Sequence, residues 1–174
     1  ARWFHFTGIT PALGATARRT VTEAARAAKA AGATVSCDLN FRKKLWTTAE
    51  AQATMRPLME HVDVCIANEE DADKCLGMTA GATDVHGAEL DEAGYVELAK
   101  KLKREFDFET VAITLRESFS ASHNGWSAIL HDDKDCATPV RSTRYDIQIV
   151  DRVGGGDSFA SGLIAGLLQK DDTR

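Results

Sequence analysis

The hydrophobic positions along the chain follow two periods in turn. Short runs rich in β-branched and aromatic residues indicate strands, whereas longer stretches with apolar residues every three or four positions indicate amphipathic helices. Strands are predicted at residues 3–7, 34–39, 63–67 and 110–115. Helices are predicted between them at residues 15–31, 47–60, 68–76 and 91–106, with a loop at residues 81–88. This alternation predicts βαβ units and a largely parallel sheet covered by helices.

The pattern changes after residue 115, where strand-like segments follow one another without a helix between them. Two strands, at residues 118–122 and 126–131, are predicted to form a hairpin that turns at Asn124-Gly125, a dipeptide that favours tight turns. The last part of the chain contains a polar turn, a strand and a helix, at residues 132–135, 145–150 and 158–168. The predicted fold class is therefore α/β, with a mostly parallel sheet and a β-hairpin near the C-terminal end.

Composition excludes several classes of protein. The 174 residues are 44% hydrophobic and 27% charged, which is typical of a single globular domain with a substantial core. The formal net charge of −5 argues against a general nucleic-acid binder, since such proteins present a basic face. No apolar run approaches the roughly 20 residues that span a bilayer, so no membrane partner is expected. The four cysteines form no C-x-x-C pair, which predicts reduced, buried thiols in a cytoplasmic protein.

Three consecutive glycines, Gly154 to Gly156, lie between the last predicted strand and the final helix. Without Cβ atoms this segment can approach a ligand closely, and backbone N–H groups at a helix N-terminus suit a phosphate oxyanion. Asp157 follows directly, so a proton acceptor would stand beside a bound phosphate. The simpler alternative is a tight turn capped by Asp157 that binds nothing. A dinucleotide fingerprint would need glycine in place of Phe159, and the chain has no Walker A triplet Gly-Lys-Ser/Thr.

Three motifs carry a resemblance to a known family. The run from Asp151 to Phe159, D-R-V-G-G-G-D-S-F, resembles the signature D-T-x-G-A-G-D-x-F of ribokinase-like (PfkB-type) carbohydrate kinases. Its departures, Arg152 and Gly155, are similar to those of 2-keto-3-deoxygluconate kinases. The segment D-L-N-F-R at residues 38–42 resembles the family's D-x-N-x-R, and residues 68–71 resemble its N-x-x-E with aspartate for glutamate. The resemblance implies a ribokinase-like three-layer α/β/α core.

The resemblance also implies roles for individual residues. Asp157 would be the catalytic base and contact the substrate, the backbone of Gly154, Gly155 and Gly156 would hold the transferred phosphoryl group, and Arg42 would face both nucleotide and sugar acid. Mg²⁺ would be held through water by Asn68 and Asp71. The expected contacts to ATP come from eight residues: Asn40, Arg42, Thr114, Arg116, Glu117, Ser118, Gly154 and Gly156.

Each of these segments also has a structural explanation from the residues alone. Asn68 is a good helix N-cap, and acidic residues after it complement the helix dipole. The polar residues at 40–42 and 114–118 could serve solvated turns. These alternatives remain open at the level of the sequence.

As a whole, the chain is expected to be one α/β domain over residues 1–174 and a fragment of a larger kinase. It would lack the family's N-terminal sugar-binding and lid region and its C-terminal helices. The expected reaction is ATP-dependent phosphorylation of 2-keto-3-deoxygluconate at its 6-hydroxyl, with Mg²⁺ as cofactor; a homo-oligomer is left open. The alternatives are a fructokinase- or ribokinase-like enzyme for another sugar and a non-catalytic nucleotide-binding fragment. The glycine spacing argues against a third class, the NAD-binding oxidoreductases.

Overall fold

A seven-stranded sheet forms the centre of the molecule in the computed structural model, which describes residues 1–79, 92–132, 139–151 and 153–169. The strands are β1 (Trp3–Thr7), β2 (Thr34–Asp38), β3 (Val64–Ala67), β4 (Thr110–Ser118), β5 (His123–Asp132), β6 (Val140–Arg141) and β7 (Tyr145–Gln148). β1 to β4 are parallel neighbours, and β4 pairs with β5 in an antiparallel hairpin. Both β6 and β7 pair with β5 in antiparallel fashion. The predicted fold class, including the hairpin, is confirmed.

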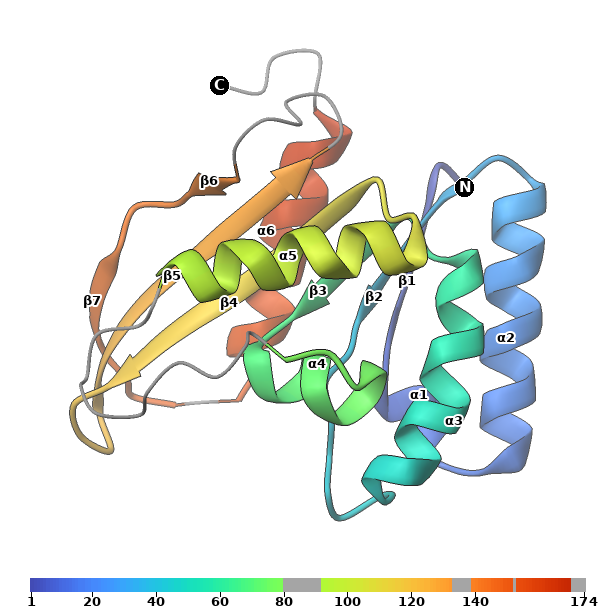
Figure 1. Ribbon diagram of the computed structural model, residues 1–174, viewed down its shortest axis with the longest axis horizontal. Helices are drawn as coiled ribbons and strands as arrows, with labels where there is room; N and C mark the ends of the chain where they lie inside the picture. Colours follow the sequence, from blue (N-terminus) through green and yellow to red (C-terminus); the bar gives the residue numbers. More distant parts are fainter. Residues whose placement is uncertain (80–91, 133–138, 152, 170–174) are drawn as a thin grey trace.

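Helices cover both faces of this sheet (Figure 1). One face is covered by α2, α3, α4 and α5, and α6 lies on the other. The helices are α1 (Ile9–Ala12), α2 (Ala15–Ala30), α3 (Thr48–Leu58), α4 (Glu69–Leu76), α5 (Glu92–Phe106) and α6 (Gly155–Leu168), and a short 3₁₀ helix at Met59–His61 follows α3. The three layers follow from the sequence, because strands apolar on both faces need a cover on each side.

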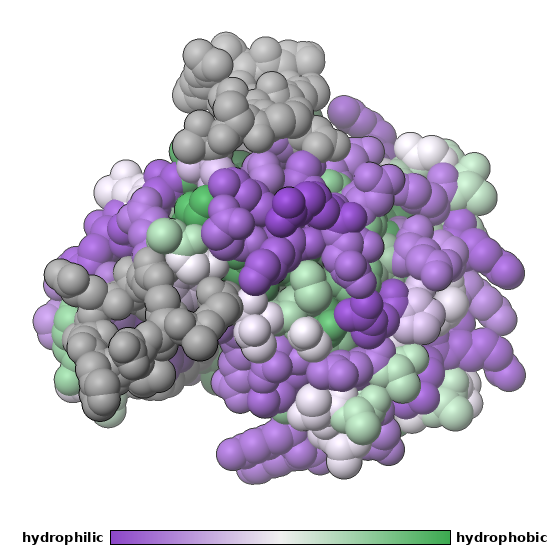
Figure 2. Space-filling view, in the orientation of Figure 1, coloured by the Kyte–Doolittle hydropathy of each residue, from purple (hydrophilic) through white to green (hydrophobic). Residues whose placement is uncertain are grey.

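The main core lies between the parallel strands and the four-helix face. Val35 and Ile113 from the sheet and Leu98 from α5 are fully buried in it. Cys37, Cys65 and Cys75 are also buried there as free thiols, as predicted, whereas Cys136 lies outside the described residues. The outer surface over these helices is largely hydrophilic (Figure 2), as expected for amphipathic helices packed by one side.

The second core, beneath α6, is smaller. Ala160 of α6 packs on Ile66 and Ala112 of the sheet. α6 begins at Gly155, three residues earlier than the apolar pattern predicts, so two of the three glycines belong to the helix. A periodicity in apolar residues cannot locate this start, because Gly155 and Gly156 carry no side chain to count.

The predicted hairpin turn is wrong. Asn124 and Gly125 lie inside β5, where Asn124 is fully buried and pairs with Ser118 of β4. The turn is instead at residues 119–122, where the backbone N–H of Phe119 donates to the carbonyl oxygen of His123 over 3.0 Å. The predicted loop at residues 81–88 and most of the predicted turn at residues 132–135 lie outside the described residues.

Candidate active site

The carboxyl ends of the parallel strands and the N-terminus of α6 enclose a cleft of about 690 Å³. The strand register brings these ends together, since Thr7 is paired with Asp38 and Asp38 with Ile66. Ligands of open α/β sheets bind at this end of the strands. The predicted site residues that line the cleft are Asn40, Arg42, Asn68, Asp71, Thr114, Arg116, Gly154, Gly155, Gly156 and Asp157.

The glycine segment presents backbone N–H groups to this cleft. Gly154 is the N-cap of α6, and its φ of 80° is a left-handed conformation that favours glycine. The N–H groups of the first helical turn have no partner within a helix, so those of Gly155, Gly156 and Asp157 are available to an anion. A Cβ atom at Gly156 would lie 3.6 Å from Oδ2 of Asp38, which shows that this residue faces the strand ends across the cleft.

Asp157 lies in the first turn of α6 and is exposed. Its main-chain oxygen accepts a hydrogen bond from Ser161 Oγ over 2.7 Å, and the residue lines the cleft. The charge of Asp157 is near enough to contribute to the raised pKa of Asp38 on the opposite side. An exposed carboxylate beside free helix N–H groups has the geometry of a base next to an anion site.

Two buried carboxyl groups form the floor of the cleft. Asp38 is 8% exposed and Asp71 is 7% exposed. Burial and, to a smaller extent, the charge of Asp71 raise the pKa of Asp38 to about 6, although the hydrogen bond from the backbone N–H of Asn40 opposes the shift. Burial also raises the pKa of Asp71 to about 6, against the hydrogen bond that its Oδ1 accepts from the Phe41 N–H over 2.9 Å. Both acids therefore lie where a cation or a proton would stabilise them.

Asp38 had no role assigned from the sequence, although it belongs to the D-x-N-x-R segment. An acid that ends an apolar strand resembles any strand-to-loop transition, and the charge that acts on it from Asp71 of α4 is distant in sequence. The signal that could have found it is topological. Asp38 ends a central parallel strand, and that is where ligands of such sheets bind.

The loop after β2 brings Arg42 into the cleft. The hydrogen bond from Phe41 to Asp71 ties this loop to α4. The guanidinium of Arg42 donates to the carbonyl oxygen of Phe41 over 3.1 Å, and its charge lowers the pKa of both Asp38 and Asp71. With one neutral partner, this guanidinium retains donors for an anionic ligand.

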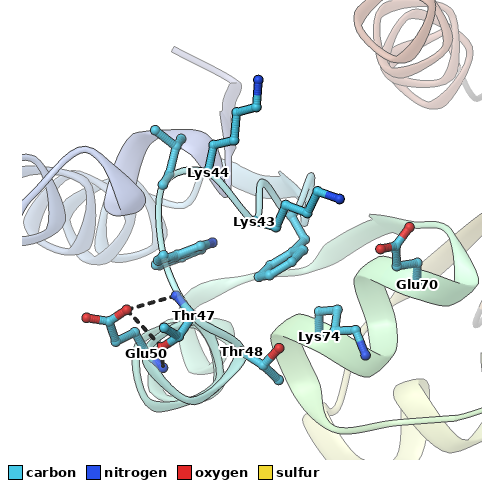
Figure 3. A pocket seen from close by; sticks show the side chains of 10 residues that line it. Lys43, Lys44, Thr47, Thr48, Glu50, Glu70 and Lys74 are labelled. Carbon is cyan, nitrogen blue, oxygen red and sulfur yellow. Dashed lines mark hydrogen bonds between the residues drawn. The ribbon is translucent and has the colours of Figure 1, made fainter.

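A capping box closes the far end of the same loop. Thr47 N-caps α3 through its side chain, and Glu50 accepts a hydrogen bond from the Thr47 N–H over 2.8 Å (Figure 3). A second pocket, separate from the cleft, lies beside this capping box, and Lys43 and Lys44 are among the residues that line it. Figure 3 shows Lys43 extending toward Glu70 and Lys44 pointing away from it. This second pocket contains none of the predicted site residues.

The end of β4 is only partly as predicted. Thr114 and Arg116 line the cleft, and the guanidinium of Arg116 lies 3.3 Å from Ser118 Oγ. Glu117 does not line the cleft but forms a bidentate ion pair with Arg144. Alternation along the strand explains the difference, because Glu117 points to the opposite side of the sheet from Arg116. Trp126 and Ile147 also line the cleft, and no contact with ATP was predicted for either of them.

The position of Asn68 is compatible with both roles considered for it, a helix N-cap and a contact in the cleft. Its side chain accepts a hydrogen bond from the Asp71 N–H over 2.8 Å, so it is the N-cap of α4, and it also lines the cleft. Over the described ranges, no group of three or more His, Cys, Asp or Glu side chains is arranged to hold a metal ion by itself.

Within the same ranges, no helix has the length and apolar character needed to cross a membrane.

Comparison with known proteins relates the whole chain to one family. Residues 4–174 match the pfkB family carbohydrate kinases. The 2-dehydro-3-deoxygalactonokinase of Haloferax volcanii is 32% identical over 165 residues, which are 95% of this chain and 44% of that protein. The solved structure of 2-dehydro-3-deoxygluconokinase from Thermotoga maritima is 49% identical with a TM-score of 0.87, over 99% of this chain and 50% of that one.

A further solved structure, a PfkB family carbohydrate kinase from Listeria grayi, is 30% identical with a TM-score of 0.81. The match covers 97% of this chain and 48% of that one. The chain therefore spans about half the length of these relatives.

Proposed function

Since the chain belongs to the pfkB family of carbohydrate kinases, we propose that the whole protein phosphorylates 2-keto-3-deoxygluconate with ATP at the 6-hydroxyl. The observation that carries the proposal is the meeting of Asp157 and the free amides of α6 with Arg42 and Arg116 in one cleft. The choice of a sugar acid is supported by two relatives that share at least 32% identity with the chain and are named as kinases of 2-dehydro-3-deoxy sugar acids.

Asp157 is the base in this mechanism. Its exposed carboxylate takes the proton of the 6-hydroxyl as that oxygen attacks the γ-phosphorus of ATP, and the bond from this phosphorus to the bridging oxygen breaks to release ADP. General-base catalysis of this kind contributes roughly 10²- to 10⁴-fold to the rate. Asp157 is better suited to this role than Asp38, because an exposed acid reaches a mobile substrate and exchanges its proton with water.

The backbone N–H groups of Gly155, Gly156 and Asp157 stabilise the charge on the transferred phosphoryl group. They are fixed by the helix and need no rearrangement as charge develops, which is the condition for effective electrostatic catalysis. Arg42 and Arg116 hold the phosphates of the nucleotide from the opposite side of the cleft. Asn40 and Thr114 add neutral polar contacts.

Mg²⁺ is proposed as the cofactor. The two carboxyl groups of Asp38 and Asp71, each with a pKa raised to about 6, fit a divalent cation that would relieve their repulsion. Asp71 and Asn68 would hold the ion through its water shell. Bound there, Mg²⁺ would neutralise charge on the phosphates of ATP.

The specific alternative is the galactonate epimer of the substrate, which is favoured by the name of the Haloferax relative. Assaying the whole protein with ATP and both 2-keto-3-deoxy sugar acids, and with fructose and ribose, would separate these substrates. A kcat/KM that is highest for fructose or ribose would contradict the assignment of a sugar acid as substrate. If no sugar is phosphorylated, the protein would instead be a nucleotide-binding protein without kinase activity.

The role of the base is tested by Asp157→Asn in the whole protein. We expect kcat to fall about 10³-fold while the Kd for ATP changes little, since the carboxylate acts on the hydroxyl and not on the nucleotide. Steady-state kinetics and calorimetric titration with ATP measure the two quantities. Turnover within about tenfold of wild type would refute the assignment.

A further inference from the structure

Arg144 forms a cross-link over three strands at the edge of the sheet. The residue directly precedes β7, and its guanidinium donates from Nε to Glu117 Oε1 over 3.0 Å and from Nη2 to Glu117 Oε2 over 2.9 Å. It also lies over the ring of Phe119 at 5.6 Å. Hydrogen bonding to Arg144 lowers the pKa of Glu117, so this pair is charged across the physiological range.

The path of the cross-link depends on Gly125 of β5. Gly125 is the ladder partner of Glu117 on one side and of Asp146 on the other, so it lies between the strand that carries Glu117 and the strand that Arg144 precedes. A Cβ atom at this position would lie 2.6 Å from Nη2 of Arg144. The guanidinium can therefore cross β5 only because no side chain is present there.

β7 has few other means of attachment. Of its four residues, Tyr145, Asp146 and Gln148 are exposed and only Ile147 is partly buried. Beyond the ladder to β5, it is held by a hydrogen bond between His123 and Asp146 over 2.6 Å. The Ile149 N–H that follows donates to the Ser122 carbonyl oxygen over 2.6 Å.

The segment held in this way leads into the cleft. Ile147, Ile149 and Asp151 line it, and the chain continues within three residues to Gly154. Asp151 Oδ1 accepts a hydrogen bond from the Val153 N–H over 2.8 Å, which shapes the approach to the glycines. A displacement of β7 would therefore move the amides that begin α6.

We propose that Arg144 and Glu117 are positioning residues that fix the glycine segment through β7, with Gly125 providing the passage between them. This inference rests on the proposed kinase function for its effect on rate. It also gives Glu117 a role other than the contact with ATP that the sequence predicts. A misplacement of about 1 Å at a catalytic group costs up to about 100-fold in rate, so a surface ion pair at this place affects turnover more than stability.

The test compares two exposed ion pairs in the whole protein. Arg144→Ala removes the cross-link. Arg141→Ala is the matched control: Arg141 ends β6, away from the cleft, and its Nη1 lies 2.6 Å from Glu92 Oε2. For Arg144→Ala we expect kcat to fall about tenfold, and amide hydrogen exchange over residues 149–158 to become several-fold faster. For Arg141→Ala we expect both to stay within about twofold of wild type, and thermal stability to change equally little in the two variants.

Two further variants distinguish positioning from direct contact. Gly125→Ala should reproduce the loss seen in Arg144→Ala and add little to it in the double variant, because both displace the same guanidinium. Glu117→Ala should lower kcat in the same way, whereas a direct contact with ATP would raise the KM for ATP without any dependence on Arg144.

Equal exchange over residues 149–158 in the Arg144→Ala and Arg141→Ala variants would overturn the inference whatever the enzyme phosphorylates. If exchange changes as expected but no sugar is phosphorylated, the positioning role stands and the proposed reaction fails.

Discussion

The two sides of the cleft are built in different ways. β1 to β4 are parallel strands that are held by the main core. Val35, Cys65 and Ile113 of these strands are fully buried in it. The glycine segment arrives from β7, where Tyr145 is 61% exposed and polar contacts hold the strand. The side chains proposed to bind phosphate thus come from strands held by the core, and the amides and the proposed base come from a region held at its edge.

This difference teaches where stability and activity should separate. Groups positioned by burial cannot be moved without losing folding free energy, because interiors are close-packed. Groups positioned by exposed ion pairs can be displaced at little cost in stability, because such pairs contribute little to it. Variants on the two sides should therefore give opposite patterns of stability and turnover.

The largest effect is expected from a comparison of Ile113→Ala in β4 with Tyr145→Ala in β7. Removing the buried isoleucine should cost about 3 kcal/mol in the free energy of unfolding, because a cavity remains in the core. Removing the exposed tyrosine should cost less than about 1 kcal/mol. Denaturant unfolding of the whole protein measures both, and equal losses would show that β7 is packed as firmly as the core.

A smaller effect, which depends on pH, is expected from Asp38→Asn. Because burial raises the pKa of Asp38 to about 6, the folded state binds its proton more tightly than the unfolded state does. Its contribution to stability is fully present below pH 4 and is lost as the pH rises through about 6. In the presence of EDTA, the Asn variant should therefore be more stable than wild type by about 2 kcal/mol at pH 7.5, and the two should converge near pH 4.

Unfolding curves at the two pH values measure this difference. Asp157→Asn, at an exposed position on the other side of the cleft, is the control and should change stability by less than about 1 kcal/mol. A wild type more stable than Asp38→Asn at pH 7.5 would mean that a contact of the charged carboxylate outweighs the cost of its burial.

The smallest effect is expected from Gly156→Ala, with Gly162→Ala in the same helix as control. The new methyl group at position 156 would enter the cleft 3.6 Å from Asp38, whereas at position 162 it would meet no atom within 4 Å. Both changes should alter stability by less than about 1 kcal/mol, because alanine favours helices. Only Gly156→Ala should lower kcat/KM for ATP, by about tenfold. Equal activities in the two variants would argue that phosphate does not approach this turn.

Most of the parallel half could be predicted from the sequence. Each strand there is buried by a neighbouring helix, and the apolar pattern along the chain records that burial directly. The edge was harder, because Asn124 and Gly125 are turn-forming residues by local preference but are held inside β5 by the ladder to β4. Local preference was outweighed by strand pairing on both sides, including the pairing of Asn124 with Ile147 of β7, which a pattern over a few residues cannot show.

The site divides in the same way. The motifs around Arg42 and Asp157 were recognised because their residues are adjacent in sequence. The raised pKa of Asp38 depends in part on the charge of Asp71, and the ion pair of Glu117 is formed with Arg144; each partner is about 30 positions away in the sequence. Single-sequence reasoning has no access to such distances, so it gave Asp38 no role and assigned Glu117 to ATP.

The buried thiols of the main core make its transient opening measurable by chemical labelling. Burial raises the pKa of Cys37, Cys65 and Cys75, so these groups remain protonated and shielded from alkylating reagents while the strands are packed. Covalent labelling of these three positions therefore requires the core between the parallel strands and their covering helices to open, and its rate follows that event. A ligand that bridges the strand ends would slow the labelling in proportion to its occupancy, without any introduced probe.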